Sequence, residues 1–438
     1  MIHKISLLIL VICLLSSRIY AEPATVSITK MGNGLTVILQ EDHAAELIGV
    51  DVWVKAGSGN ETDKGNGISH FIEHMVFGAT LKRNAGDIDL EMESLGATLD
   101  AHTSRDWAHF NTTVSSRYLP KTLDVLADAI THAQFREIDM EYERLVLLEE
   151  IANKQANPVK VCQDYLAQEL YGSHAYALPI EGTPDSIKKI TRQDILDYYH
   201  KYYVAGNIAV ILVGDFNPQA AIDEVGRAFN ALPTTPITKS EQKEIPQILK
   251  QSSRTIKSPF VLNYVALGFL GPPAADTRDV CTMDVLLTYL GFGYRSWMSE
   301  ELKGKTGLAA EVSADFLTQR EPGMVSLIAA TTDANAPKAR DAILAKLASI
   351  RKEGIPEGNL ALAKRFLLGQ FAFQNETYSG RANSYGFYYA ISEPEFANKY
   401  IDCVQAVTNE DVIKAAQKYL DPDHAAILTL VPSQSEAQ

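Results

Sequence analysis

The sequence predicts an α+β protein with two homologous domains, each an α/β sandwich in which helices cover an antiparallel-rich sheet. The first observation is an internal repeat, because residues 190–214 align without gaps with residues 407–431 at an offset of 217. In each copy a threonine caps a helix and a β-branched strand closes the unit. The second is length, since 438 residues with 46% hydrophobic content exceed what one hydrophobic core usually holds.

A third observation is the stretch at residues 232–254, which is rich in Pro, Thr, Lys and Gln and is typical of a linker between apolar units. We therefore expect the duplicated domains to meet there. The predicted segments are a signal peptide at 1–21, a metal-binding domain at 22–231, a linker at 232–254 and a second domain at 255–438.

The opening residues have the pattern of a cleaved signal peptide. Lys4 precedes an apolar run over residues 5–15, and the segment ends on the small residue Ala21. The run is too short to span a bilayer comfortably, and no later stretch of about 18 apolar residues follows. The sequence therefore predicts a periplasmic or secreted protein without a membrane span.

Apolar periodicity predicts the elements of the first domain in order. Strands are expected near residues 25–30, 35–40, 46–55, 97–103 and 107–115. Helices are expected near residues 67–78, 86–95, 118–133, 139–156, 159–171 and 192–202. The second domain should repeat the order, with hairpin strands first, helices in the middle and a returning strand last.

An HxxEH motif occupies the predicted helix 67–78. His70 and His74 are four residues apart, so both imidazoles lie on one helix face and can bind one tetrahedral metal. Glu73 borders that face, where it can hold an activated water and take its proton rather than ligate. This pattern indicates a zinc site and a peptidase.

Two histidines require a third protein ligand before water takes the fourth position of a catalytic zinc. Glu143 and Glu150 are seven residues apart in the predicted helix 139–156, which places them about two turns apart on one face. We predict Glu150 as the ligand and Glu143 as an acid that orients a ligand or tunes the water. Glu149 points about 100° away and is the weaker candidate.

Residues 57–80, GSGNETDKGNGISHFIEHMVFGAT, resemble the active-site segment of the pitrilysin, insulinase and mitochondrial processing peptidase family. Residues 142–158 resemble its third-ligand helix, and residues 181–216 its domain-closing helix and strand. The resemblance implies a zinc endopeptidase with one zinc per chain. It implies the roles already named: His70, His74 and Glu150 for the metal, and Glu73 for water activation.

The second copy lacks the motif, because the same offset leads to residues 284–291, DVLLTYLG, which hold neither histidine nor glutamate. It carries Arg381 and Tyr388, whose spacing of seven places them on one helical face. The resemblance implies that this pair contacts the substrate backbone and the oxyanion from the domain opposite the metal. Without the resemblance, we would interpret Arg381 as a surface arginine and Tyr388 as a packed tyrosine.

The resemblance also implies a partner chain. The longest family members form a four-domain clamshell, of which a two-domain chain is half. Half-length relatives pair, so that one partner's second domain faces the other's zinc. We expect a homodimer, or a heterodimer with a related chain.

Substrate binding is expected on the predicted strand 97–103, because relatives pair an extended peptide with this edge strand. Asp100, Ala101 and His102 are the predicted substrate-binding residues. The family often has Asn where this chain has Asp100. A carboxylate beside the scissile bond would repel a developing oxyanion, so Asp100 either faces away or alters the preferred substrate.

Composition excludes other classes. The formal charge is −14, and loss of residues 1–21 makes it more negative, so nucleic acid is not an expected partner. Cys162, Cys281 and Cys403 remain after that cleavage and permit at most one internal disulfide. None has CxxC spacing, and we interpret them as buried packing residues.

The predicted function is zinc-dependent hydrolysis of extended or unfolded peptides. One alternative is a non-catalytic subunit that holds peptide or stabilises a family heterodimer, against which the intact metal set argues. Another is a peptidase dedicated to one precursor.

Overall fold

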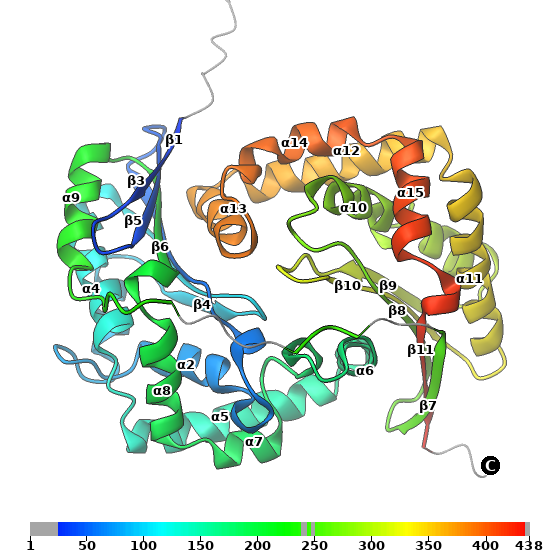
Figure 1. Cartoon of the computed structure of the whole chain (residues 1–438), viewed down its shortest axis with the longest axis horizontal. Helices are drawn as coiled ribbons and strands as arrows, with labels where there is room; N and C mark the ends of the chain where they lie inside the picture. Colours follow the sequence, from blue (N-terminus) through cyan, green and yellow to red (C-terminus); the bar gives the residue numbers. More distant parts are fainter. Residues whose placement is uncertain (1–24, 238–242, 247–249, 434–438) are drawn as a thin grey trace, which may run out of the picture.

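The computed structural model describes residues 25–237, 243–246 and 250–433. The predicted signal peptide lies outside the described residues, as do parts of the predicted linker and the last five residues of the chain. The chain folds into two mixed sheets that helices cover, arranged side by side as half of a clamshell (Figure 1). The predicted fold class is therefore confirmed.

The first sheet has the order β1-β2-β6-β3-β5-β4, in which β2 and β6 run parallel and the other neighbours antiparallel. All of β6 is buried, which its unbroken apolar sequence explains. The short strand β4 lies at the edge. The bounds are β1 (Val26–Lys30), β2 (Thr36–Glu41), β3 (Leu47–Val54), β4 (Asp100–Thr103), β5 (Ala108–Ser115) and β6 (Ile208–Gly214).

The second sheet, in the order β7-β11-β8-β10-β9, repeats the first strand by strand once β1 is left aside. Its β7 and β11 are parallel, as β2 and β6 are, and its edge strand β9 corresponds to β4. The duplication seen in the sequence therefore extends to strand order. The bounds are β7 (Ser252–Ser258), β8 (Asn263–Leu270), β9 (Glu311–Phe316), β10 (Met324–Thr331) and β11 (Ala426–Pro432).

Every strand and helix predicted for the first domain is present, with ends that differ by at most three residues. The short α7 and the proline-initiated α9 were not predicted. The helices of this half are α2 (Ile68–Val76), α3 (Asp87–Ser94), α4 (Leu119–His132), α5 (Glu137–Gln155), α6 (Pro158–Tyr171), α7 (Pro184–Lys189), α8 (Arg192–Tyr202) and α9 (Pro218–Ala228). Those of the other half are α10 (Thr277–Gly291), α11 (Ala336–Glu353), α12 (Glu357–Gln374), α13 (Tyr378–Ile391), α14 (Phe396–Ala406) and α15 (Asn409–Tyr419).

Two helices that correspond under the repeat, α6 and α13, are exchanged between the halves. Helix α13 packs on β3 and β6 of the first sheet, whereas α6 packs on β8, β10 and β11 of the second (Figure 1). Gly386 permits the first contact, because a Cβ there would overlap the indole of Trp53. Since each sheet is covered by the other half's helix, the two halves share buried apolar clusters and form one body.

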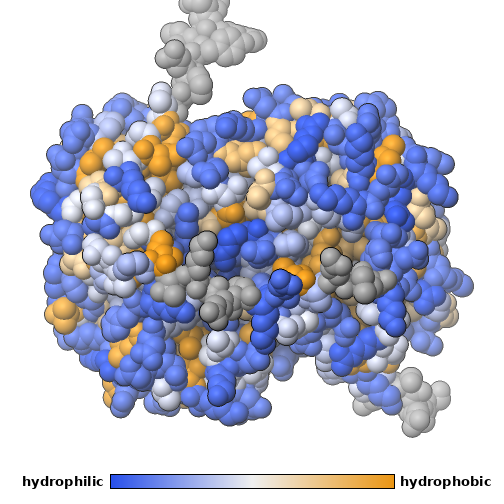
Figure 2. All heavy atoms as spheres, viewed as in Figure 1, coloured by the Kyte–Doolittle hydropathy of each residue, from blue (hydrophilic) through white to orange (hydrophobic). Residues whose placement is uncertain are grey.

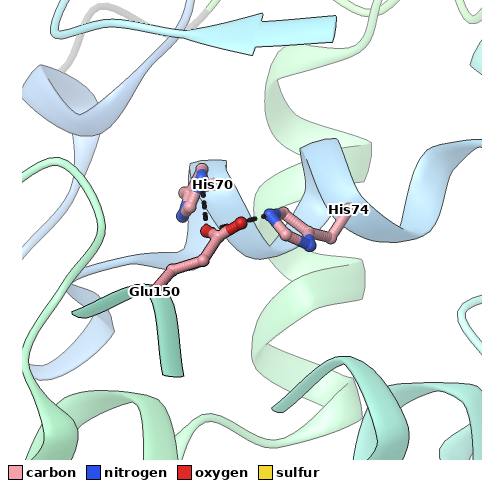
Figure 3. A group of neighbouring side chains, drawn as sticks. All are labelled: His70, His74 and Glu150. Atoms are coloured by element: carbon pink, nitrogen blue, oxygen red, sulfur yellow. Dashed lines mark ion pairs between the residues drawn. The ribbon is translucent and has the colours of Figure 1, made fainter. Parts of the chain in front are cut away.

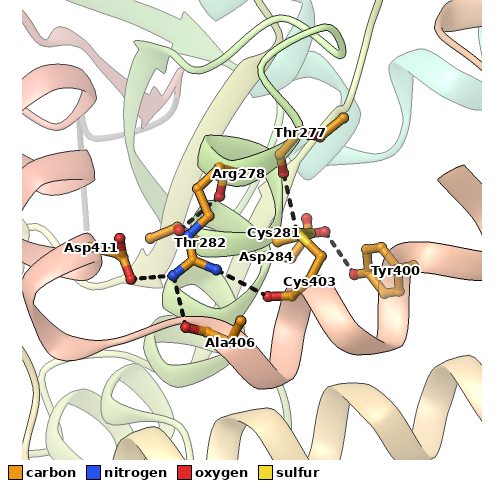
Figure 4. The surroundings of a disulfide bond; sticks show 9 residues. All are labelled: Thr277, Arg278, Cys281, Thr282, Asp284, Tyr400, Cys403, Ala406 and Asp411. Atoms are coloured by element: carbon orange, nitrogen blue, oxygen red, sulfur yellow. Dashed lines mark hydrogen bonds and ion pairs between the residues drawn. A yellow bond between two sulfur atoms is a disulfide. The ribbon is translucent and has the colours of Figure 1, made fainter.

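A disulfide joins Cys281 on α10 to Cys403 on α14, across 122 residues of chain (Figure 4). Our interpretation of the cysteines as packing residues is therefore wrong for these two, and it is confirmed for Cys162, which is buried and free. The pairing depends on how two distant helices pack, which cysteine spacing does not encode.

The face of the molecule in Figure 2 is mostly hydrophilic, with hydrophobic side chains in small groups. Among the described residues, no helix combines the length and the apolar character that crossing a membrane requires.

Candidate metal centre

Helix α2 presents both histidines on one face because its other face is buried. Ile68, Phe71, Ile72, Met75 and Val76 pack into the core of the first domain. This apolar stripe sets the rotation of the helix. His70 and His74 keep side chains that are 12% and 15% exposed, on the face that packs toward α5.

Glu150 reaches from α5 into the space between the two imidazoles (Figure 3). Its Oε2 lies 3.6 Å from Nε2 of His70 and 3.4 Å from Nε2 of His74. One ligand atom from each of the three residues lies within 4.8 Å of the others, and no second group of this kind occurs in the part of the chain that the structure describes. The predicted ligands are thus brought together, and Glu149 is not part of this group.

Glu143, also on α5, forms a hydrogen bond with the other ring nitrogen of His74. Nδ1 of His74 donates to Oε2 of Glu143 at 3.1 Å. This leaves Nε2 directed at the Glu150 carboxylate, and a carboxylate on the far nitrogen makes an imidazole a stronger metal ligand. The contact is the one that the predicted supporting role of Glu143 requires, and the role itself stays a prediction.

Burial keeps His70 in the form that binds metals. It lowers the pKa of His70 to about 4, and the neighbouring His74 adds to the shift. At neutral pH the imidazole is therefore uncharged, as metal coordination requires. Nδ1 of His70 is buried and has no hydrogen-bond partner among the described residues.

Glu73 lies beside the triad, between α2 and the edge strand β4. Burial raises the pKa of Glu73, and the Thr103 side chain and His74 oppose that shift. Its Oε2 is buried without a hydrogen-bond partner among the described residues. This oxygen can therefore accept a hydrogen bond from a water or from another group at the site.

The donor set fits zinc. Two imidazoles and one carboxylate are a three-ligand set typical of catalytic zinc, in which a fourth position stays open for water. Beside His74 and Glu143 lies a cavity of about 430 Å³, whose walls include Phe77, Ile138 and Tyr142. Its walls also include the acids Asp89 and Asp139, and it is large enough for one side chain of a substrate.

The predicted substrate strand is β4, whose outer edge pairs with no other strand among the described residues. Ala101 packs against the first-domain core, and Thr103 lies next to Glu73. Because strand residues alternate, Asp100 and His102 point to the other face. Asp100 is exposed there and faces away from α2, whereas His102 stacks on His109 at 5.3 Å.

Arg381 and Tyr388 make their contacts elsewhere in this chain. Arg381 donates to Oδ2 of Asp42 at 2.8 Å and lies over the ring of Tyr378, at the boundary between the halves. Tyr388 is 8% exposed in the core of the second half, packed against Phe396. A substrate role for the pair stays a prediction for an assembly of two chains.

In the second half, the offset of the repeat aligns Leu287, Leu290 and Gly291 of α10 with His70, Glu73 and His74. Among the described residues, no cluster of metal-ligating side chains occurs there.

Sequence reasoning missed two further features of the site. Lys154 pairs with Glu181 at 2.5 Å, and Glu181 lies within electrostatic range of His70. Glu61 bonds to the start of α2. Glu61 stands in the quoted segment 57–80, but nothing in its spacing from His70 indicates this contact.

Two family models match the chain. "Insulinase (Peptidase family M16)" matches residues 36–184, which include the triad, and "Peptidase M16 inactive domain" matches residues 189–367.

Curated proteins and solved structures agree with these matches. The chain is 25% identical to an uncharacterized zinc protease of Bacillus subtilis, over 90% of this chain and 96% of that one. It is 30% identical to a probable mitochondrial-processing peptidase subunit beta of Arabidopsis thaliana, over 69% of this chain and 55% of that one. The crystal structure of a protease from Helicobacter pylori has the same fold, with a TM-score of 0.88 at 24% identity over 93% of this chain and 100% of that one.

Proposed function

The chain belongs to the M16 (insulinase) family of peptidases, and we propose that it is a zinc-dependent endopeptidase that hydrolyses extended or unfolded peptides. The observation that carries the proposal is the meeting of His70, His74 and Glu150, with ligand atoms within 4.8 Å of one another, beside the half-buried acid Glu73.

His70, His74 and Glu150 would hold the zinc, which when bound supplies a Lewis acid and lowers the pKa of a water ligand to about 7. The chain's own residues prepare the site. Burial keeps His70 neutral, and Glu143 fixes the ring of His74.

Glu73 is the proton carrier. Its carboxylate takes the proton from the attacking water and later donates it to the leaving amine, so that one side chain serves both halves of the reaction. Burial raises the pKa of Glu73, which makes its carboxylate a better proton acceptor than an exposed one.

The edge strand β4 supports an extended substrate. A peptide that pairs with β4 gains backbone hydrogen bonds that do not depend on its sequence. Ala101 would lie against that peptide, while Asp100 and His102 line the face away from α2. The cavity beside His74 would take one side chain of the substrate.

Two alternatives stand beside this proposal. A non-catalytic subunit is supported only by the match of the second half to an inactive-domain model, and the intact metal set of the first half argues against it. Likeness to a probable mitochondrial-processing peptidase subunit beta favours the other alternative, a peptidase dedicated to one precursor.

We also propose a partner chain and an exported location. A homodimer, or a heterodimer with a related chain, would close the half-clamshell and could bring Arg381 and Tyr388 to the partner's metal. The disulfide between Cys281 and Cys403 supports export, because such bonds persist in oxidising compartments.

The experiment is metal analysis of the purified protein together with cleavage-site mapping on a mixed peptide library, with His70→Ala as control. We expect one zinc per wild-type chain, none in the variant, and cleavage only by the former. Broad cleavage with a length limit supports a general peptidase, and a single defined cut supports precursor processing. A wild-type protein that binds no zinc would refute the proposal.

A further inference from the structure

Glu61 is a buried acid that no ion pair neutralises among the described residues. Glu61 is only 7% exposed and lies close to the start of α2. Oε2 accepts hydrogen bonds from the backbone N–H of Gly67 at 2.8 Å and from Nδ2 of Asn66 at 3.2 Å. Oε1 accepts from the backbone N–H of Ser69 at 2.8 Å. These three groups are all donors.

The carboxylate takes the place of a helix cap. The first N–H groups of a helix have no partner within it and carry the positive end of the helix dipole. Gly67 is the N-cap of α2 and has no side chain to bond them. Burial raises the pKa of Glu61 to about 7. The ionised form nevertheless matches these donors, because a protonated carboxyl oxygen would be a donor that faces another donor, the N–H group.

The capped turn leads directly into the metal ligands. Ser69, whose N–H bonds to Glu61, precedes His70. The Ser69 hydroxyl donates to the Tyr198 hydroxyl at 2.8 Å, which ties the same turn to α8. Gly67 is packed so closely that a Cβ would come within 3.0 Å of the carbonyl oxygen of Glu181. The start of α2 is therefore held from several sides.

The second half of the chain shows that this arrangement is not a requirement of the fold. There α10 begins at Thr277, which the repeat offset aligns with Asn60, eight residues before the start of α2. The residue aligned with Glu61 is Arg278, which lies inside α10 and donates to the carbonyl oxygen of Ala406 and to Asp411 (Figure 4). The half without metal ligands thus has a longer helix and no buried carboxylate at this place.

In the first half, two short 3-10 turns, Ser58–Asn60 and Asp63–Gly65, replace the beginning of that helix. The shortened α2 starts two residues before His70, and the N–H groups exposed by the break are those that Glu61 bonds. Among the described residues, the break and the Glu61 carboxylate occur together in the half that carries the metal ligands.

We infer that Glu61 is a positioning residue of the metal centre: its carboxylate fixes the first turn of α2 so that His70 and His74 meet Glu150 across the gap to α5. The inference rests on the proposed zinc site. A small rotation or fraying of this turn would move both imidazoles together, whereas Glu150 is carried by another helix and would not follow.

The test is the zinc affinity of Glu61→Gln, measured by competition with a chromophoric chelator well below the melting temperature of the metal-free protein. An amide cannot accept with both of its atoms, so one backbone N–H would face an NH2 group. We expect zinc to bind about 10- to 100-fold more weakly, the range typical of lost supporting contacts. At saturating zinc, kcat should fall while KM changes little.

The matched control is Glu91→Gln, which removes the same charge from the same half. Glu91 pairs with Arg83 and Lys121 and has no contact with α2 in the ion pairs of the structure. It should lower thermal stability and leave zinc affinity unchanged. Asn66→Ala, which removes one donor to Glu61 without touching either backbone N–H, should weaken zinc binding less than Glu61→Gln does.

The outcomes separate the two proposals. If the wild-type protein binds no zinc, the proposed function fails. If it binds zinc and Glu61→Gln binds within twofold of it, or loses no more affinity than Glu91→Gln, the positioning role fails alone. Should Glu61→Gln not fold, Glu61→Asp and Asn66→Ala decide, since wild-type zinc affinity in both would overturn the inference.

Discussion

Oε2 of Glu143 lies 3.1 Å from Nδ1 of His74, while Glu150, two turns further along the same helix, lies 3.4 Å from the other nitrogen of that ring. One helix therefore supplies both a proposed ligand and the acid proposed to orient a second ligand. Helix α5 approaches α2 with its Glu143–Glu150 face, and this packing decides the geometry of the site.

Replacing Glu143 with Ala should weaken zinc binding about 10- to 100-fold, because the ring of His74 would lose the carboxylate that fixes its orientation. Equilibrium competition with a chelator measures this directly. Glu149→Ala is the control, since Glu149 is exposed on the same helix and should leave the affinity unchanged. Equal affinities for the two variants would contradict the role of Glu143.

Glu73→Gln should retain zinc and lower kcat/KM by about 10²- to 10⁴-fold, because the amide cannot accept the proton of the attacking water. Metal content and peptide cleavage are measured on the same preparation. Full activity in this variant, with zinc bound, would refute the assignment of Glu73 as the base.

Stability should depend on pH through Asp284, which accepts a hydrogen bond from Tyr400. Burial raises the pKa of Asp284 to about 6 from 3.8, and Tyr400 opposes the shift. Between these values the folded state binds more protons than the unfolded state, so stability falls as pH rises from about 4 to 6 and the penalty is complete above that range.

Asp284→Asn should remove that fall, because the amide oxygen can still accept from Tyr400 and carries no charge. As the pH rises from 4.5 to 7, we expect the free energy of unfolding of the variant to increase by roughly 1–3 kcal/mol relative to that of the wild type. Urea unfolding at the two pH values measures the difference. Parallel pH dependence in both proteins would rule out Asp284 as its source.

Loss of the disulfide should destabilise the second half. Because the bond closes a loop of 122 residues, its removal in a Cys281→Ala, Cys403→Ala variant should cost about 3–5 kcal/mol on the chain-entropy account. Thermal unfolding with and without a reductant tests this. The reductant should lower the melting temperature of the wild type and of Cys162→Ala, and should not change that of the double variant.

Much of the fold could be predicted from local patterns in the sequence. Helix α2 and helix α5 follow from apolar periodicity, and the threonine caps Thr191 and Thr408 mark the repeated helices that precede β6 and β11. The histidines of HxxEH share a face because four residues make about one turn, which holds in any helix. These features depend on neighbours in the sequence, so the sequence alone determines them.

Other features depend on which distant segments touch. That Glu61 bonds the start of α2, that Cys281 meets Cys403, and that Tyr388 is buried in a core are all results of packing. The exchange of α6 and α13 between the halves belongs here as well, since amphipathic helices show that they have an apolar face but not which sheet will cover it.

The sequence by itself determined the elements, the duplication, and the residue types of a zinc site in one copy only. The tertiary structure decided that Glu150 rather than Glu149 faces the histidines, and that a buried carboxylate holds their helix in place. The physical reason is that helical and strand periods are local, whereas the distance between two helices and the burial of a charge are set by the contacts of the whole chain.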